Sequence, residues 1–450
     1  MTYLFAALAL SATSMFSDTT IASRDSLEAE IEASLREELL QVWYPRVVDE
    51  EYGGFLTTFS HDWQLEGPQD KFIVTQARHV WTASRAAERY PEDHRYMQAA
   101  RHGFEYLRDY LWDSERGGFF ELRSREGELR RDRSGSIVKQ AYGNAFGLYA
   151  LAAYFEVSRD SAALSLAQDA FRWLEAHSHD PVHGGYFQFI GQDGTPMRSG
   201  YGHYPPKDQN SSIHLLEALT ELYRVWQDSL LAVRLEEMLV LIRDRITTPE
   251  GYMQLFFLED WTPISYRDSS ATLREANFEL DHVSFGHDVE TAFLMLEATE
   301  ALGQPVGLRT LPIAKKMVDH ALAFGWDADA GGLYDRGYYF PSSTEPAIIL
   351  PTKTWWSQAE ALNTFLIMAD LFPDDPWDYA AAFRKQWEYV DRYLIDHEYG
   401  GWYGGGLDQE PERASMPKAH LWKAAYHDGR ALLNVVRRMH HTWTDPLHAH

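Results

Sequence analysis

The chain has 450 residues, enough for two or three average domains or for one large closed domain. Its 67 acidic and 41 basic residues give a formal charge of −26, which argues against nucleic acid and anionic membranes as partners because both attract basic surfaces. The sequence has no cysteine, which excludes disulfides, thiolate nucleophiles and cysteine-bound metals, and no apolar run reaches the roughly 18 residues of a membrane helix.

The N-terminal residues share one feature with a short signal peptide, because the stretch from Tyr3 to Ala12 is apolar and small residues follow it. The stretch lacks the Lys or Arg that usually precedes such a segment. We therefore expect a cytoplasmic protein, with a periplasmic or secreted location as the alternative if residues 1–14 act as a signal peptide. Residues 1–24 are predicted as a flexible segment, 25–440 as one catalytic domain and 441–450 as a C-terminal tail.

A glycine-centred, aromatic-rich motif recurs six times, for example as EEYGGFLTTF from Glu50 and as EYGGWYGGG from Glu398. Successive leading glycines are 64, 67, 67, 80 and 69 residues apart. Six copies at nearly one period indicate an internal structural repeat. The leading glycines are Gly53, Gly117, Gly184, Gly251, Gly331 and Gly400.

Helical segments lie on both sides of this motif. Amphipathic segments precede it, as at residues 26–43, 96–112 and 381–394, with apolar residues at three- and four-residue spacing. The segments that follow it carry small and apolar residues on most faces, which is typical of buried helices. These more apolar segments are residues 77–90, 141–155, 212–226, 286–302, 355–372 and 426–439.

Each repeat is therefore predicted as an outer helix, a glycine turn, a short β-hairpin and an inner helix. An open array of six such units would expose both ends, whereas a ring would not. The predicted fold is all-α: an (α/α)6 barrel, or toroid of six helical hairpins, with short β-hairpins at one mouth.

Polar and ionisable side chains occupy the first turns of the predicted inner helices, whereas later turns are apolar. Any one of these side chains alone would be more typical of a satisfied core residue. Their recurrence in five of the six repeats favours a functional site at one mouth of the barrel. The predicted site residues are Arg78, Tyr142, Asn210, His214, His287, Glu290, Trp356, Glu360, Trp422 and His427.

His287 and Glu290 are three residues apart, so their side chains are neighbours on one helix face. We expect Glu290 to accept a proton from one imidazole nitrogen of His287 and so raise the basicity of the other. His427 would face the same cavity, and two histidines can serve as the acid and the base of a proton transfer at neutral pH.

Motifs for metals and nucleotides are absent from the sequence. It contains no HExxH, no EF-hand loop, no glycine-rich phosphate loop and no dinucleotide fingerprint. We therefore predict neither a metal nor a cofactor.

Five motifs, each on its own repeat, carry a family resemblance. They are QARHVW from Gln76, NSSIHLLEA from Asn210, SFGHDVE from Ser284, WWSQAEAL from Trp355 and LWKAAYHDGRALL from Leu421. In this order they resemble the N-acylglucosamine 2-epimerase superfamily, most closely its cellobiose 2-epimerase and mannose 2-epimerase branch. The resemblance covers about Leu27 to Met439 and implies an (α/α)6 barrel and cofactor-free epimerisation at C2 of an aldose, through a cis-enediolate.

The resemblance also implies roles for the site residues. His287 and His427 match the motif histidines that share the acid/base work, and Glu290 matches the carboxylate that supports the first of them. Arg78 and His214 match groups that hold the reactive end of the sugar and stabilise negative charge. The remaining matches are the ring-stacking residues Trp356 and Trp422 and the hydroxyl-binding residues Tyr142, Asn210 and Glu360.

Some features depart from the family pattern. Asp428 follows His427 where cellobiose epimerases usually have Asn, and the loops Thr195–Asp208 and Tyr338–Thr354 are longer than expected. These differences surround the mouth, so free mannose or glucose and a disaccharide such as cellobiose both remain open as substrates. We expect a small sugar as the ligand, no nucleic acid or membrane partner, and a monomer or weak homodimer.

Three alternative functions are considered. An aldose–ketose isomerase would share the enediolate and return the proton to a different carbon. An (α/α)6 glycoside hydrolase would need two carboxylates, for which Glu290 and Glu360 are the candidates, but would leave the histidines unexplained. A non-catalytic sugar-binding protein fits the aromatic content, but such a protein would not need both His287 and His427.

Overall fold

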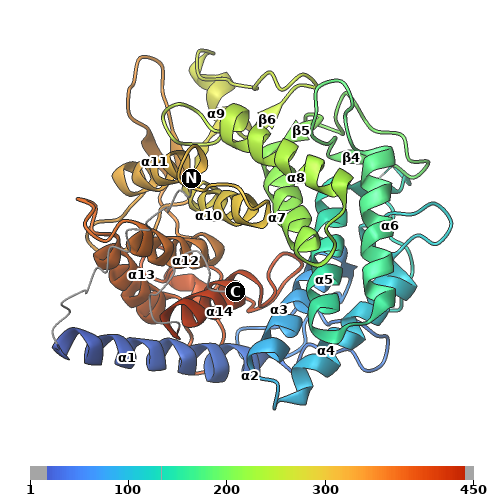
Figure 1. The fold of residues 1–450 in the computed structure, drawn as a ribbon, viewed down its shortest axis with the longest axis horizontal. Helices are drawn as coiled ribbons and strands as arrows, with labels where there is room; N and C mark the ends of the chain where they lie inside the picture. The colour runs from blue at the N-terminus through green and yellow to red at the C-terminus, as the bar shows by residue number, and fades with distance from the viewer. Residues whose placement is uncertain (1–17, 133, 441–450) are drawn as a thin grey trace, which may run out of the picture.

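The structure is a computed structural model that describes residues 18–132 and 134–440 of the chain. Six helices form an inner ring (Figure 1). Neighbouring inner helices contact one another in chain order, and the last of them also contacts the first, so the ring is closed. The inner helices are α3 (Ile73–Arg89), α5 (Ala141–Ser158), α7 (Gln209–Val225), α10 (Phe285–Ala301), α12 (Trp355–Leu371) and α14 (His427–His440).

An outer layer of helices surrounds this ring. Each outer helix packs mainly against the inner helix that precedes it in the chain, and the first outer helix packs against the last inner helix, α14. Three of them pass into short π-helical turns, η1 (Ser34–Leu40), η2 (Leu107–Leu111) and η3 (Ile242–Ile246). The outer helices are α1 (Asp18–Ala33) with α2 (Gln41–Trp43), α4 (His94–Tyr106), α6 (Ser161–His177), α8 (Ser229–Leu241), α11 (Thr310–Phe324) and α13 (Tyr379–Tyr393). The predicted (α/α)6 barrel is confirmed. Across the described residues, no helix combines the length and apolar character needed to span a bilayer.

Short antiparallel ladders connect neighbouring repeats at the mouth where the inner helices begin. The strand before one inner helix pairs with the strand after the next glycine turn, so the ladders join two repeats. The predicted hairpin within a single repeat occurs as β8–β9. The strands are β1 (Lys71–Phe72), β2 (Leu122–Arg123), β3 (Val138–Gln140), β4 (Phe189–Gly191), β5 (Lys207–Asp208), β6 (Phe256–Phe257), β7 (Val283–Ser284), β8 (Arg336–Tyr338) and β9 (Ala347–Leu350).

The glycine turns require their glycines. Gly53 and Gly54 have φ of 77° and 65°, in the left-handed region that side chains disfavour. A Cβ on Gly54 would also lie 2.6 Å from Oε1 of Gln76, a side chain that accepts a hydrogen bond from the backbone N–H of Phe55. The turn therefore packs directly against its inner helix.

A buried lysine–aspartate pair stabilises five of the six glycine turns, a feature that we did not predict. Each aspartate lies four residues before the leading glycine, and each lysine also donates to the carbonyl of that glycine. The pairs are Lys71–Asp49, Lys139–Asp113, Lys207–Asp180, Lys353–Asp327 and Lys418–Asp396.

The fourth repeat replaces both partners of this pair. Thr247 stands four residues before Gly251, and Val283 stands two residues before α10, a position that lysine occupies before α3, α5, α7 and α12. Replacing only one partner would leave the other charge buried and unpaired, which is costly, so we interpret the joint loss of both charges as avoiding that cost.

An additional helix, α9 (Ala271–Asp281), lies between β6 and β7 and accounts for the long interval of 80 residues in the repeat. The ring of Phe278 packs against that of Tyr338 at 4.6 Å, and the Tyr338 hydroxyl donates to Asp281 Oδ2 at 2.9 Å. This helix was not predicted, and it packs against β8, the strand that pairs with β7, which leads into α10.

Candidate active site

The predicted site residues gather at the mouth where the inner helices begin. Except for Trp422, which lies in the turn before α14, they all fall within the first two turns of inner helices. Because the N-terminal ends of these helices converge there, their dipoles favour negative charge at the mouth.

His427, the first residue of α14, is hydrogen-bonded to a buried carboxylate. Its Nδ1 lies 2.6 Å from Oε1 of Glu360, a side chain with no exposed surface. The same carboxylate oxygen lies 2.7 Å from Nη2 of Arg430, one turn further along α14. Arg430 also forms ion pairs with Glu217 and Glu290, so one guanidinium links three carboxylates below the mouth.

His214 reaches the same network from α7. Its Nδ1 lies 2.9 Å from Oε2 of Glu217, while the other oxygen of Glu217 accepts a hydrogen bond of 2.6 Å from the Tyr426 hydroxyl. Two histidines therefore have carboxylate partners, and Arg430 connects the two pairs.

His287 has a different partner from the one predicted. Its Nδ1 shares a hydrogen bond of 2.8 Å with the hydroxyl of Ser284, whereas Glu290 pairs with Arg430. The predicted hydrogen bond between His287 and Glu290 is therefore wrong. Their spacing allows the contact, but the Arg430 guanidinium attracts the Glu290 carboxylate more strongly than a neutral imidazole does.

Trp356 lies between the two candidate acid/base histidines. Its ring centroid is 4.5 Å from that of His287 and 5.9 Å from that of His427. Imidazoles from α10 and α14 therefore flank one indole of α12.

Burial sets the protonation of these groups. It lowers the pKa of His287 to about 3, and it lowers the pKa of His427 well below the usual range, with a further contribution from Arg78 and Arg430. Burial raises the pKa of Glu360 well above its usual range despite the opposing charge of Arg430, and nearby Glu290 raises it further. At neutral pH both imidazoles are therefore neutral, and Glu360 holds a proton next to His427.

The pKa of Glu217 moves in the opposite direction. Burial would raise it, but Arg430 and His214 outweigh burial and lower it to about 2. An ionised Glu217 accepts the Nδ1 proton of His214 and fixes the tautomer of that ring.

Arg78 closes the other side of the mouth. It donates to the Tyr142 hydroxyl at 3.2 Å and to the Trp422 carbonyl at 3.1 Å, and its Nε has no protein partner among the described residues. Oδ1 of Asn210, in the first turn of α7, is likewise buried without a partner. Trp422 is half exposed and packs edge-on against Phe72.

Three of these groups could contact a metal ion. Ligand atoms of Glu290, Glu360 and His427 lie within 4.8 Å of one another, and no other such cluster occurs among the described residues. The Arg430 guanidinium already contacts both carboxylates, so a metal ion would have to displace it. The chemistry of this cluster is therefore that of a charged hydrogen-bond network.

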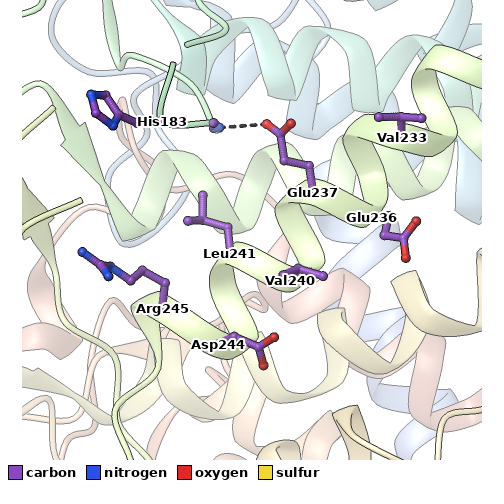
Figure 2. Close-up of a pocket in the computed structure, with 10 residues that line it drawn as sticks. His183, Val233, Glu236, Glu237, Val240, Leu241, Asp244 and Arg245 are labelled. Carbon is purple, nitrogen blue, oxygen red and sulfur yellow. Dashed lines mark hydrogen bonds between the residues drawn. The ribbon is translucent and has the colours of Figure 1, made fainter. Parts of the chain in front are cut away.

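A separate hollow lies on the outer layer, over α8 and the third glycine turn (Figure 2). It has a volume of about 410 Å³ and is lined by Val233, Val240 and Leu241 with charged residues at its edge. Oε1 of Glu237 accepts a hydrogen bond of 2.8 Å from the backbone N–H of Gly185 there. None of the predicted site residues lines this hollow.

Comparison with known proteins decides the family. The sequence profile of the N-acylglucosamine 2-epimerase (GlcNAc 2-epimerase) family matches residues 53–429, most of the chain. The chain belongs to the N-acylglucosamine 2-epimerase family. It is an enzyme of this family, as the five sequence motifs predicted.

Relatives in this epimerase family match most or nearly all of the chain. A cellobiose 2-epimerase from Bacteroides fragilis is 28% identical over 423 residues, or 91% of this chain and 98% of the relative. A D-mannose isomerase from Pseudomonas cannabina is 23% identical over 346 residues, 74% of this chain and 76% of the relative. The solved structure of cellobiose 2-epimerase from Spirochaeta thermophila superposes with a TM-score of 0.79 at 30% identity, covering 94% of this chain and 99% of that one.

Sequence reasoning missed part of the network beneath the epimerase-family motifs. Arg430 lies three residues after His427, and Glu217 lies three residues after His214. The second spacing repeats that of His287 and Glu290, and it was a signal that a histidine–carboxylate pair could form on α7. Ser284, the partner of His287, stands at the start of the quoted motif SFGHDVE.

Proposed function

We propose that this enzyme is an aldose 2-epimerase that interconverts the gluco and manno configurations at C2 of a sugar. The observation that carries the proposal is the pair of neutral imidazoles, His287 and His427, on either side of Trp356. Inversion at a carbon atom needs one group to remove a proton from one face and another to supply a proton to the opposite face. Two imidazoles, from the two helices that flank α12, meet that need.

The reaction begins when the sugar ring opens and exposes the C1 carbonyl. In one direction His287 accepts the C2 proton through Nε2, since its Nδ1 is engaged by Ser284. The electron pair of the C2–H bond forms the enediolate, and the negative charge moves to the C1 oxygen. His427 then donates a proton to the opposite face of C2, and Glu360 restores the proton to its imidazole across the 2.6 Å hydrogen bond. In the reverse direction the two histidines exchange roles.

Arg78 and His214 stabilise the enediolate. The free Nε–H of Arg78 and the ring of His214, whose Nδ1 is engaged by Glu217, are suited to binding the C1 oxygen as it gains charge. The first turns of six helices add a favourable potential at the same place. The remaining predicted contacts are ring stacking by Trp356 and Trp422 and hydroxyl binding by Tyr142 and Asn210.

Glu360 and Glu290 take roles other than those predicted. We assign Glu360 as the proton store of His427, because its carboxyl is bonded to that imidazole and is fully buried. Glu290 acts through Arg430 as a positioning residue. A hydrolase that used these two carboxylates is disfavoured, because the Arg430 guanidinium fills the space between them.

Alanine substitutions test the assignment. His287→Ala and His427→Ala each remove one proton-transfer group, so each should reduce the rate of epimer formation from mannose by at least about 10²-fold. His397→Ala, at an exposed site in the outer layer, is the matched control and should retain activity. Substantial turnover by either His287→Ala or His427→Ala, with an intact fold by circular dichroism, would refute the two-histidine mechanism.

Aldose–ketose isomerisation is the second candidate function. It shares the enediolate and differs only in returning the proton to C1, and a D-mannose isomerase is among the relatives. Chromatography of the products separates the two functions, because an isomerase accumulates fructose from mannose whereas an epimerase accumulates glucose.

A further inference from the structure

A further histidine, His282, lies beside the strand that leads to His287. Its backbone is extended, with φ of −74° and ψ of 165°, and it continues directly into β7. Side chains two residues apart in extended backbone project to the same face, so His282 shares a face with Ser284, the hydrogen-bond partner of His287. Burial is the main cause of the low pKa of His287, and nearby His282 is among the groups that lower it further.

The ring of His282 has one engaged nitrogen and one free nitrogen. Its Nδ1 lies 2.8 Å from the carbonyl oxygen of Phe278, and a carbonyl only accepts hydrogen bonds, so Nδ1 carries the ring proton. Burial lowers the pKa of His282 to about 4, and Arg336 lowers it further, so the ring is neutral at pH 7. Nε2 is therefore an unprotonated acceptor, and it has no hydrogen-bond partner among the described residues.

Ser284 has the donor that this acceptor lacks. When Nδ1–H of His287 donates to Ser284 Oγ across 2.8 Å, the serine hydroxyl keeps its own proton for another acceptor. No atom in the described part of the chain accepts that proton, although Ser284 is only 6% exposed. A free donor and a free acceptor therefore lie two residues apart on one face of the strand.

The two histidines stand at opposite ends of their helices. His287 lies in the first turn of α10, where the helix dipole disfavours positive charge, whereas His282 follows the last turn of α9, where the dipole favours it. Glu279 in that last turn also favours protonated His282, and it forms an ion pair with Arg336, the opposing cation. The local electrostatic field therefore favours transfer of a proton from His287 to His282.

We propose that His282, acting through Ser284, is the proton store of His287. This inference rests on the proposed epimerase function, in which Glu360 has the same role for His427. When His287 Nε2 takes the C2 proton, its Nδ1 proton passes to Ser284 Oγ. The serine hydroxyl proton then passes through one bridging water molecule to His282 Nε2, since the two side chains share no direct hydrogen bond.

Protons and charge balance along this path. After the transfer His287 is a neutral ring protonated at Nε2, Ser284 is again a hydroxyl, and His282 carries the positive charge. The reverse reaction returns the same protons by the same path. His282 is thus a positioning residue that acts through His287, and the additional helix α9 supplies the helix end that stabilises its charge.

Substitution of His282 tests the proton path through kcat. His282→Gln keeps a hydrogen-bonding side chain that cannot take up a proton, so kcat for mannose should fall at least about tenfold while KM stays unchanged. Free imidazole should restore kcat of His282→Ala, because it replaces the missing acceptor. His320→Gln is the matched control and should keep the parent kcat. His320 is also a buried histidine whose pKa burial lowers to about 4, but it lies on the outer helix α11.

A double variant shows whether the two residues act in one path. Ser284→Ala and His282→Gln interrupt the same path, so together they should reduce kcat no more than the more impaired single variant does. Ser284→Thr keeps the hydroxyl and should keep kcat. Near-parent kcat in His282→Gln, additive losses in the double variant, or a loss in His282→Ala that imidazole does not restore would overturn the proposal.

Nitrogen-15 NMR of the histidine rings separates this proposal from the epimerase function. In the resting enzyme at pH 7, His282 should carry its proton on Nδ1 and none on Nε2. A protonated Nε2 could not accept a further proton and would overturn the proton path even if the epimer forms. The expected tautomer together with absent epimerisation would support the free acceptor and refute only the proposed reaction.

Discussion

Glu360→Gln is the sharpest perturbation of the proposed chemistry, because it changes one ionisable group and almost no volume. Oε1 of Glu360 contacts both His427 and Arg430, and the side chain is fully buried. If the amide oxygen keeps both contacts, the ring proton moves to Nδ1 and His427 has no Nε2 proton to donate. If the amide NH₂ faces His427 instead, the ring proton stays on Nε2, but the amide has no proton to pass to Nδ1.

Either orientation should reduce kcat by about 10²- to 10⁴-fold, which corresponds to an increase of about 3 to 5 kcal/mol in the activation free energy of epimerisation. Stability should change far less. Arg430 retains Glu217 and Glu290, and the substitution removes a carboxyl whose ionisation Glu290 opposes. We expect the free energy of unfolding to stay within about 1 kcal/mol of the parent value.

The assay is the initial rate of epimer formation, with urea unfolding measured on the same samples. Glu156→Gln is the matched control, since Glu156 pairs with Arg85 in the last turns of α5, away from the mouth. A Glu360→Gln variant with near-parent kcat and intact fold would refute the role of Glu360 as a proton store. A large loss of stability would show that the carboxylate is mainly structural.

Three further predictions concern pH and stability. The pKa of His287 is lowered to about 3, and that of His427 lies well below its usual range, so kcat/KM should not fall on the acid side near pH 6.5. A fall of kcat/KM near pH 6.5 would contradict the proposal that both imidazoles are neutral. Loss of the proton from Glu360, whose pKa is raised, should instead give an alkaline limb that Glu360→Gln lacks. Lys207→Val should lower the free energy of unfolding by about 3–5 kcal/mol, because it leaves Asp180 buried and unpaired. Adding Asp180→Thr, which reproduces the residues of the fourth repeat, should recover most of this loss. Additive losses of the two substitutions in urea unfolding would refute the pairing. Burial raises the pKa of Asp288, so its protonated form stabilises the fold at low pH and this contribution is lost as pH rises. Asp288→Asn should therefore raise Tm more at pH 8 than at pH 5 in calorimetry, and an equal shift at both values would mean that Asp288 is not protonated in the fold.

Much of the fold followed from the glycine motif, because its period marks each repeat and its glycines must adopt left-handed conformations. Gly53 and Gly54 illustrate the reason, since no other residue fits against Gln76 at that turn. The helix α9 could not be predicted in the same way. It has no buried residue, so its sequence lacks the apolar periodicity that identifies a helix in contact with a core.

The candidate site was predictable as a set of residues but not as a set of contacts. The pattern His-x-x-Glu occurs at His214 and at His287, and only the first pair is bonded in the structure. The difference depends on Arg430, which lies far away in sequence and attracts Glu290 from another helix. Spacing along one helix predicts which side chains are neighbours, whereas the strongest partner of a buried charge is set by tertiary packing.

Residues 1–14 and the tail 441–450 lie outside the described residues, so the predicted signal-peptide alternative and the C-terminal tail stay predictions. The same holds for a monomer or weak homodimer.

Proton NMR of mannose, glucose and cellobiose in D₂O with the purified enzyme tests the central claim most directly. Removal and return of the C2 proton by two histidines predicts that deuterium enters C2 as the epimer forms. Epimer formation with the original hydrogen kept at C2, or accumulation of ketose alone, would contradict a C2 epimerase that works through an enediolate with solvent-exchanging histidines.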